Sequence, residues 1–237
     1  QGSFLGPLIF LILIDDLTAP CLVHKFVDDT TLSEILSNNQ TSLMPTYFQE
    51  VLDWSTTNFS KTINFSKTKE MIIGTLNNDP PSALTASANN IERVHTYKLL
   101  GITLNDKLKW DNHINNICSK ASSRLYFLKL LKCSRVSLVD LLYYYSTIVR
   151  PVLEYACQVW HASLTKEQSA RIEKIQKRAL RIIYGCDSYD NLCMVHSIEK
   201  LESRRDELNK KFFKTILHDS SCLNYLLPVP PPINTSN

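Results

Sequence analysis

The spacing of apolar residues changes near residue 110, and this change restricts the possible folds more than any other feature. Before it, short runs rich in β-branched and aromatic residues alternate with turn residues. After it, apolar residues recur at helical spacing. The helices predicted for this later section cover residues 111–131, 137–149, 151–161, 166–184 and 198–217. A mixed section followed by an all-helical one predicts the α+β class, with two structural units.

The earlier section is predicted to hold two helices and several short strands. Gly6-Pro7 and the apolar run that reaches Leu17 favour a buried helix, because proline is tolerated in a first helical turn. A second helix is expected over 41–59, and residues 74–90, rich in Asn, Ser, Ala and Pro, are expected to form a loop. The predicted strands cover residues 23–27, 30–35, 63–65, 71–73 and 94–104.

The helical section carries local start and stop signals. Asp111 is expected to cap the first of its helices. The segment 166–184 has basic residues on most of its faces, and Gly185 is expected to end it. Its predicted core-facing stripe consists of Ile172, Ile175, Ala179, Ile182 and Ile183.

Charge is distributed unevenly along the chain. Residues 1–110 hold 8 Lys and Arg against 11 Asp and Glu, whereas residues 111–237 hold 18 against 12. An acidic first section would suit metal ions, and a basic second section would suit a phosphate backbone. Solvated helix faces explain the same charges equally well.

Cysteine usage indicates an intracellular protein. The seven cysteines form no C-x-x-C pair, so neither a zinc site nor a disulfide framework is predicted. Reduced thiols in the nucleus or cytoplasm, without secretion, are the expectation. The apolar run 8–14 is too short to span a bilayer and is closed by Asp15-Asp16, so no membrane anchor is predicted.

The strongest candidate site is Phe26-Val27-Asp28-Asp29. Two predicted strands flank the aspartates, which places the carboxylates on a tight turn. Adjacent carboxylates repel each other, and a bound divalent cation removes that repulsion. Mg²⁺ prefers a few carboxylates together with substrate phosphates. A plain Asp-Asp turn is the alternative for this tetrapeptide alone.

Five ordered blocks resemble the reverse transcriptases of non-LTR (LINE-type) retrotransposons, across roughly residues 1–185. The first is the opening Gln1–Phe10, which resembles the motif that contacts nucleotide and template, and the second is the Phe26–Asp29 tetrapeptide at the family's spacing. The next palm segment is matched by Leu52-Asp53-Trp54, Asn58, Ile63-Asn64 and Lys67-Thr68-Lys69. Tyr97–Ile102 with Leu108-Lys109-Trp110 resembles the primer grip, and Tyr143–Ile148, Pro151–Tyr155, Val159-Trp160 and Arg178–Ile183 resemble the segment after the palm.

The resemblance implies a metal site and a nucleotide site. Asp28 and Asp29 would bind Mg²⁺ or Mn²⁺ in the complete enzyme, with Asp28 the more direct ligand. Gln1 and Gly2 would lie against the incoming nucleotide and the template base. Phe26 would pack near the primer end, where the wider group of reverse transcriptases has Tyr.

Further roles concern the phosphates and the primer. Lys67 or Lys69 would lie near the phosphates, and one of them could protonate the departing pyrophosphate. A solvated strand end is the alternative for these lysines. Leu100-Gly101 would form the turn that holds the primer strand. The implied partners are an RNA template, a DNA primer and deoxynucleoside triphosphates, and the sequence indicates no oligomeric state.

The resemblance also defines the expected organisation. Residues 1–110 would form a partial polymerase palm of short antiparallel strands with packed helices, 111–218 a helical thumb-like region, and 219–237 a Pro-rich disordered tail. A complete palm carries another aspartate on a strand before the Gln-Gly motif, and this sequence begins at that Gln. We therefore expect an RNA-directed DNA polymerase fragment that is inactive alone. The alternative is a decayed element remnant or a non-catalytic nucleic-acid-binding module.

Overall fold

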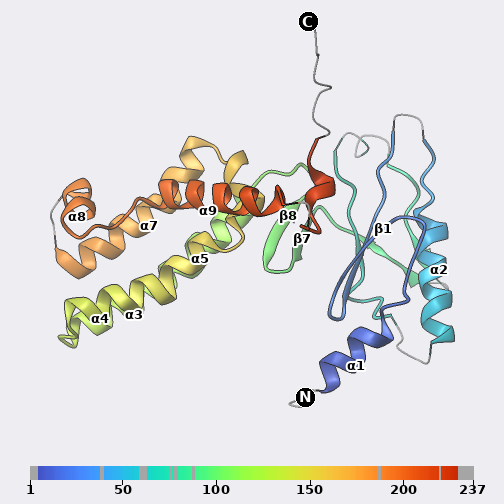
Figure 1. Ribbon diagram of the computed structural model, residues 1–237, viewed down its shortest axis with the longest axis horizontal. Helices are drawn as coiled ribbons and strands as arrows, with labels where there is room; N and C mark the ends of the chain where they lie inside the picture. The colour runs from blue at the N-terminus through green and yellow to red at the C-terminus, as the bar shows by residue number, and fades with distance from the viewer. Residues whose placement is uncertain are drawn as a thin grey trace, which may run out of the picture. The chain divides into compact units, whose positions relative to one another are not determined.

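A computed structural model describes residues 5–37, 40–58, 63–74, 76, 80–86, 89–185, 188–218 and 220–228 (Figure 1). It combines helices with two-stranded sheets, which confirms the predicted α+β class. The chain divides into two compact units: Gln1–Lys98 with Asn105–Leu108, and Leu99–Leu104 with Lys109–Asn237. No helix in the described ranges is both long enough and apolar enough to cross a membrane.

The first unit contains two helices and several short strands. Its elements are α1 (Leu5–Leu13), β1 (Leu22–Phe26), β2 (Asp29–Ser33), α2 (Met44–Thr57), β3 (Lys69–Glu70), β4 (Thr85–Ala86), β5 (Asn89–Asn90) and β6 (Glu92–Arg93). The pairs β1–β2 and β4–β5 are antiparallel, whereas β3 and β6 pair in parallel, contrary to the expected antiparallel arrangement. A small core of Phe48, Leu52, Leu84 and Ile91 supports them.

Two strand predictions in this unit are wrong. Residues 63–65 and 71–73 are not strands, and the strand β3 lies between them. The strands β4 and β5 also fall inside the predicted loop 74–90. Strand β3 was missed because its residues are charged: Lys69 pairs with Glu92 of β6, and Glu70 pairs with Arg93. Such pairs leave no apolar alternation in the sequence.

Helix α1 differs from its prediction in length and in burial. It ends at Leu13, and none of its residues is buried. The side chains of Leu8, Ile9 and Ile12 are 50%, 60% and 69% exposed. After the helix, the Lys25 ammonium donates to the carbonyl oxygens of Ile14 and Asp15, each at 2.8 Å. The ammonium thus satisfies backbone carbonyls of the turn that directly follows the helix, where no helical partner is present.

The second unit is helical around one large core. Strands β7 (Thr96–Leu99) and β8 (Ile102–Asn105) form a sheet where the predicted strand 94–104 folds back on itself; most of β7 is assigned to the first unit and most of β8 to the second. The helices are α3 (Asp111–Cys133), α4 (Leu138–Tyr144), α5 (Arg150–Glu154), α6 (Cys157–Trp160), α7 (Lys166–Tyr184), α8 (Tyr189–Val195) and α9 (Leu201–Ile216). Fully buried residues of α3 and α7 form the centre of the core, among them Ile114, Leu125, Leu128, Ile172, Leu180 and Ile183.

The helix boundaries show three departures from expectation. Helices α4 and α5 are continuous through a π-helical turn, Tyr145–Val149, because Pro151 has no N–H and its ring crowds the carbonyl one turn earlier. The predicted helix 151–161 instead breaks at Ala156, which has φ 49°. Asp111 does not cap α3; it is the first residue of α3, and its carboxylate accepts a hydrogen bond from Gln168 of α7 at 2.8 Å.

Two short elements in the last fifty residues were not expected from the sequence. Helix α8 was not predicted, since its seven residues are too few to display a clear helical period. A 3-10 turn, η4 (Asn224–Leu226), lies within the segment expected to be a disordered tail. Residues 229–237 of that expected tail lie outside the described ranges. In α7, Ile172, Ile175, Ala179 and Ile183 are buried as predicted, whereas Ile182 is only partly buried.

A buried phenol joins the π-helical turn to α7. Burial raises the pKa of Tyr145, so its hydroxyl stays protonated and donates to Oε1 of Gln176, which is also buried. The Gln176 Nε2 in turn donates to the Glu199 carbonyl at 2.9 Å. This side-chain network replaces the water that these polar groups lose on folding.

Replacing Tyr145 with Phe is expected to lower the free energy of unfolding by about 1–3 kcal/mol, because Gln176 would keep a buried oxygen without a donor. Urea unfolding followed by circular dichroism measures the change. The matched control is Tyr143→Phe, since Tyr143 is 69% exposed. Equal effects of the two substitutions would contradict the importance of the buried hydrogen bond.

Candidate functional site

Asp28 lies on a two-residue hairpin turn, and Asp29 is the first residue of the strand that follows it. Strands β1 and β2 pair from Leu22 with Ser33 to Phe26 with Asp29, which leaves Val27 and Asp28 as the turn. Val27 adopts φ 53°. A β-branched residue in this left-handed region is rare because its side chain crowds the backbone. The predicted tight turn between two strands is therefore confirmed for Asp28, whereas Asp29, expected on the turn, already belongs to β2.

The side chains around this turn face solvent. Asp28 and Asp29 are both exposed, and the neighbouring Phe26 side chain is 60% exposed. Carboxylate oxygens are the ligands that hard divalent cations prefer. Within the described ranges, no group of three or more Asp, Glu, His or Cys side chains could hold a metal ion. Asp28 and Asp29 are therefore two exposed carboxylates of the chemical kind that binds a divalent cation.

The two candidate lysines differ in their surroundings. The ammonium of Lys69 contacts the Glu92 carboxylate at 2.5 Å, in the β3–β6 pair. Lys67 is exposed on the turn before β3, and its ammonium has no ion-pair partner in the described part of the chain. There, no hydrogen bond or ion pair joins either lysine to Asp28 or Asp29. Lys67 is consequently the more accessible cation.

Leu100 and Gly101 form a second two-residue turn, between β7 and β8. Their φ angles are 45° and 87°. Successive positive φ values are typical of the tight hairpin turns whose twist matches that of the flanking strands. Gly101 takes this conformation without strain, whereas Leu100 requires support from its surroundings. The predicted turn is therefore present at the predicted residues.

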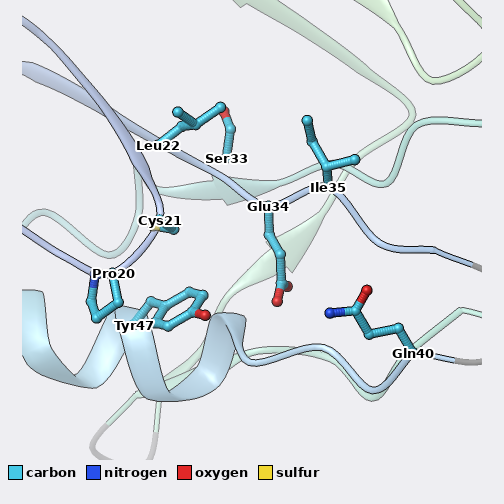
Figure 2. Close-up of a pocket in the computed structure, with 8 residues that line it drawn as sticks. All are labelled: Pro20, Cys21, Leu22, Ser33, Glu34, Ile35, Gln40 and Tyr47. Atoms are coloured by element: carbon cyan, nitrogen blue, oxygen red, sulfur yellow. The ribbon is translucent and has the colours of Figure 1, made fainter.

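A shallow pocket of about 250 Å³ lies away from the aspartates (Figure 2). Leu22 and Ser33 line it, and this pair closes the opposite end of the hairpin from Phe26 and Asp29. The Glu34 carboxylate in the pocket accepts hydrogen bonds from the Ser42 hydroxyl at 2.7 Å and the Leu43 backbone at 2.9 Å. This carboxylate thus stabilises the start of α2, so the pocket is not the candidate metal site.

Helix α7 presents a stripe of exposed cations. Lys174, Arg178 and Arg181 recur at spacings of four and three residues, which places them on one helical face. They have no ion pair with any residue in the described ranges. An unneutralised stripe of this kind suits a phosphate backbone. We call these three residues the α7 basic stripe.

Comparison with known proteins identifies relatives over most of the chain. The chain is 25% identical over 221 residues to "Probable RNA-directed DNA polymerase from transposon X-element" of Drosophila melanogaster, covering 89% of this chain and 24% of that protein. It is 28% identical over 206 residues to "RNA-directed DNA polymerase from mobile element jockey" of the same fly, covering 80% and 22%. The chain is similar to a section of RNA-directed DNA polymerases from mobile elements.

A third relative, "Probable RNA-directed DNA polymerase from transposon BS" of Drosophila melanogaster, is 25% identical over 230 residues, covering 89% of this chain and 25% of that protein. The chain thus spans about a quarter of the length of these curated relatives. No family model and no solved structure matches it. The resemblance to reverse transcriptases of non-LTR retrotransposons is confirmed, and it covers a section of those proteins.

The residues that the resemblance assigns to a site belong to different units of the chain. Gln1 and Gly2 lie outside the described ranges. The aspartates with Phe26 belong to the β1–β2 hairpin of the first unit, and the Leu100-Gly101 turn belongs to the second unit. Sequence reasoning missed Glu92 as the partner of Lys69, because the two are 23 residues apart and neither belongs to a recognisable pattern.

Replacing Gly101 with Ala is expected to destabilise the Leu100-Gly101 turn by about 1 kcal/mol or more, because alanine is strained at this positive φ. An added Cβ would also approach the Tyr155 ring to 3.1 Å. Thermal unfolding provides the measurement. Gly6→Ala is the control, since a Cβ added to Gly6 would meet no atom within 4 Å; equal melting temperatures for the two variants would contradict the strain expected at Gly101.

Proposed function

We propose that this chain is the part of an RNA-directed DNA polymerase that supplies carboxylates to the metal site, the turn that holds the primer, and a helical surface for the template–primer duplex. The observation that carries the proposal is the β1–β2 hairpin, whose strained turn exposes Asp28 and Asp29 directly after the strand. The resemblance to RNA-directed DNA polymerases along most of the chain supports it.

The carboxylates of Asp28 and Asp29 are ligands of the type that divalent cations prefer. Asp28 and Asp29 offer adjacent carboxylates, and their exposure leaves room for substrate phosphates. The described residues supply no third carboxylate to this group. A bound Mg²⁺ or Mn²⁺ would supply activation of the attacking primer hydroxyl and neutralisation of phosphate charge. Asp28, on the turn itself, is the residue we propose as the more direct ligand.

The remaining residues would position the substrates. Phe26 presents an exposed ring beside the aspartates, suited to packing against the primer end. The turn at Leu100-Gly101 would hold the primer strand. Lys67 would lie near the triphosphate and donate a proton to the departing pyrophosphate, because Lys69 is already engaged by Glu92. The substrates of the complete enzyme would be deoxynucleoside triphosphates, with an RNA template and a DNA primer.

Exchanging both Asp28 and Asp29 for Asn is expected to lower primer extension at least about 100-fold, because the amides keep the shape but lose the charge that holds the cation. The assay uses a polymerase that joins this chain to the upstream palm strand and fingers. Asp15→Asn is the matched control, since Asp15 is an exposed aspartate of the same unit. Unchanged extension by the double variant would refute the proposed metal site.

A second candidate function is a nucleic-acid-binding module without catalysis, or a decayed element remnant. The α7 basic stripe favours the binding module, because its cations lack acidic partners in the described ranges. Such a module would bind a template–primer duplex by releasing counterions from the phosphates. A remnant would bind no duplex even at low ionic strength.

Changing Lys174, Arg178 and Arg181 together to Gln is expected to weaken duplex binding and to reduce the slope of log affinity against log salt by about 2–3. Fluorescence anisotropy over a salt series measures both. The control removes the same charge from exposed lysines of other helices, through Lys120→Gln, Lys129→Gln and Lys214→Gln. If both triple variants lose affinity equally, the stripe is not the duplex-binding surface.

A further inference from the structure

The break between α5 and α6 orients one tyrosine toward the Leu100-Gly101 turn. Helix α5 ends at Glu154, and Tyr155 leaves the helical conformation with ψ 123°. Ala156 then turns the chain in the left-handed region at φ 49°. Alanine reaches this region only at a cost of about 1–2 kcal/mol. Because this break costs energy, we ask what the resulting direction of the Tyr155 side chain contacts.

Tyr155 contacts both residues of the turn. Its hydroxyl donates a hydrogen bond to the Leu100 carbonyl oxygen at 3.0 Å, across 55 residues of sequence. Its ring lies against Gly101, since a Cβ built on that glycine would be 3.1 Å from Cε1 of the tyrosine. Leu100 at φ 45° is the residue that needs external support. The tyrosine therefore stabilises the less favourable half of the turn.

The tyrosine is itself anchored to the core of the second unit. The buried Trp160 indole donates from Nε1 to the Tyr155 carbonyl oxygen at 3.1 Å. The guanidinium carbon of the buried Arg205 lies 5.9 Å from the centre of the Trp160 ring. Arg205 is held by His161, with 3.1 Å between Nε and Nδ1. A continuous set of contacts thus connects α9 with the turn.

We propose that Tyr155 is a positioning residue that fixes the Leu100-Gly101 turn in the conformation that receives the 3′ end of a primer strand. The proposal rests on the proposed function, because the primer is the ligand that function assigns to the turn. Tyr155 does not itself contact reacting atoms in this account. It acts through the Leu100 carbonyl and the packing of its ring on Gly101.

The structural half of the proposal is tested by amide hydrogen exchange on the full chain. Tyr155→Phe removes one hydroxyl and keeps the ring, so the fold should persist. We expect the amides of Gly101 and Ile102 to exchange about 3- to 10-fold faster, as expected for the loss of one hydrogen bond. Tyr126→Phe is the control, because Tyr126 is 61% exposed on α3. Unchanged exchange in Tyr155→Phe would overturn the proposal.

The functional half is tested by binding two duplexes of equal length to the same proteins. One has a recessed primer 3′ end over an RNA template, and the other is closed by loops at both ends. We expect Tyr155→Phe to raise Kd for the recessed duplex about 5- to 10-fold and to leave Kd for the closed duplex within about 2-fold. Tyr126→Phe should change neither value.

The outcomes separate the two proposals. Equal loss on both duplexes, together with a lower melting temperature, would mean that Tyr155 only stabilises the fold, and this would overturn the inference. A wild-type chain that binds neither duplex would refute the proposed function and the primer role with it. In that case the exchange measurement would still decide whether Tyr155 holds the turn.

Discussion

Tight turns in the left-handed backbone region determine the geometry of both candidate sites. At Val27 and at Leu100, a branched side chain occupies a conformation that L-residues rarely adopt. Each turn reverses the chain within two residues, so the strands before and after it pair directly. Without the first turn, Asp29 would not pair with Phe26 at the end of β1. Without the second, β7 would not pair with β8.

The two turns obtain their support differently. Hydrogen bonding between β1 and β2 brackets Val27, and Lys25 ties the same hairpin to the end of α1. Leu100 is held by a side chain from 55 residues later, whose own orientation depends on the buried Trp160. The second turn is therefore connected to the large helical core, whereas the first belongs to a unit with a small core.

The first unit also exposes much apolar surface. Helix α1 is apolar around most of its circumference, yet none of its residues is buried. Helices of this composition are normally covered by other protein, and large exposed apolar surfaces typically mark contact sites. The chain corresponds to about a quarter of the length of its relatives.

Local sequence determined a large part of this protein. Helical periodicity gave α3, α7 and α9 nearly to their ends, and the acidic tetrapeptide gave the first turn, because such features depend on neighbouring residues alone. Tertiary structure decided what lies between distant residues: the pairing of β3 with β6, the engagement of Lys69 by Glu92, the break at Ala156, and the contact of Tyr155 with Leu100. These contacts join residues 23 or 55 positions apart. Their energies depend on the packing of the whole unit, so no local pattern could reveal them.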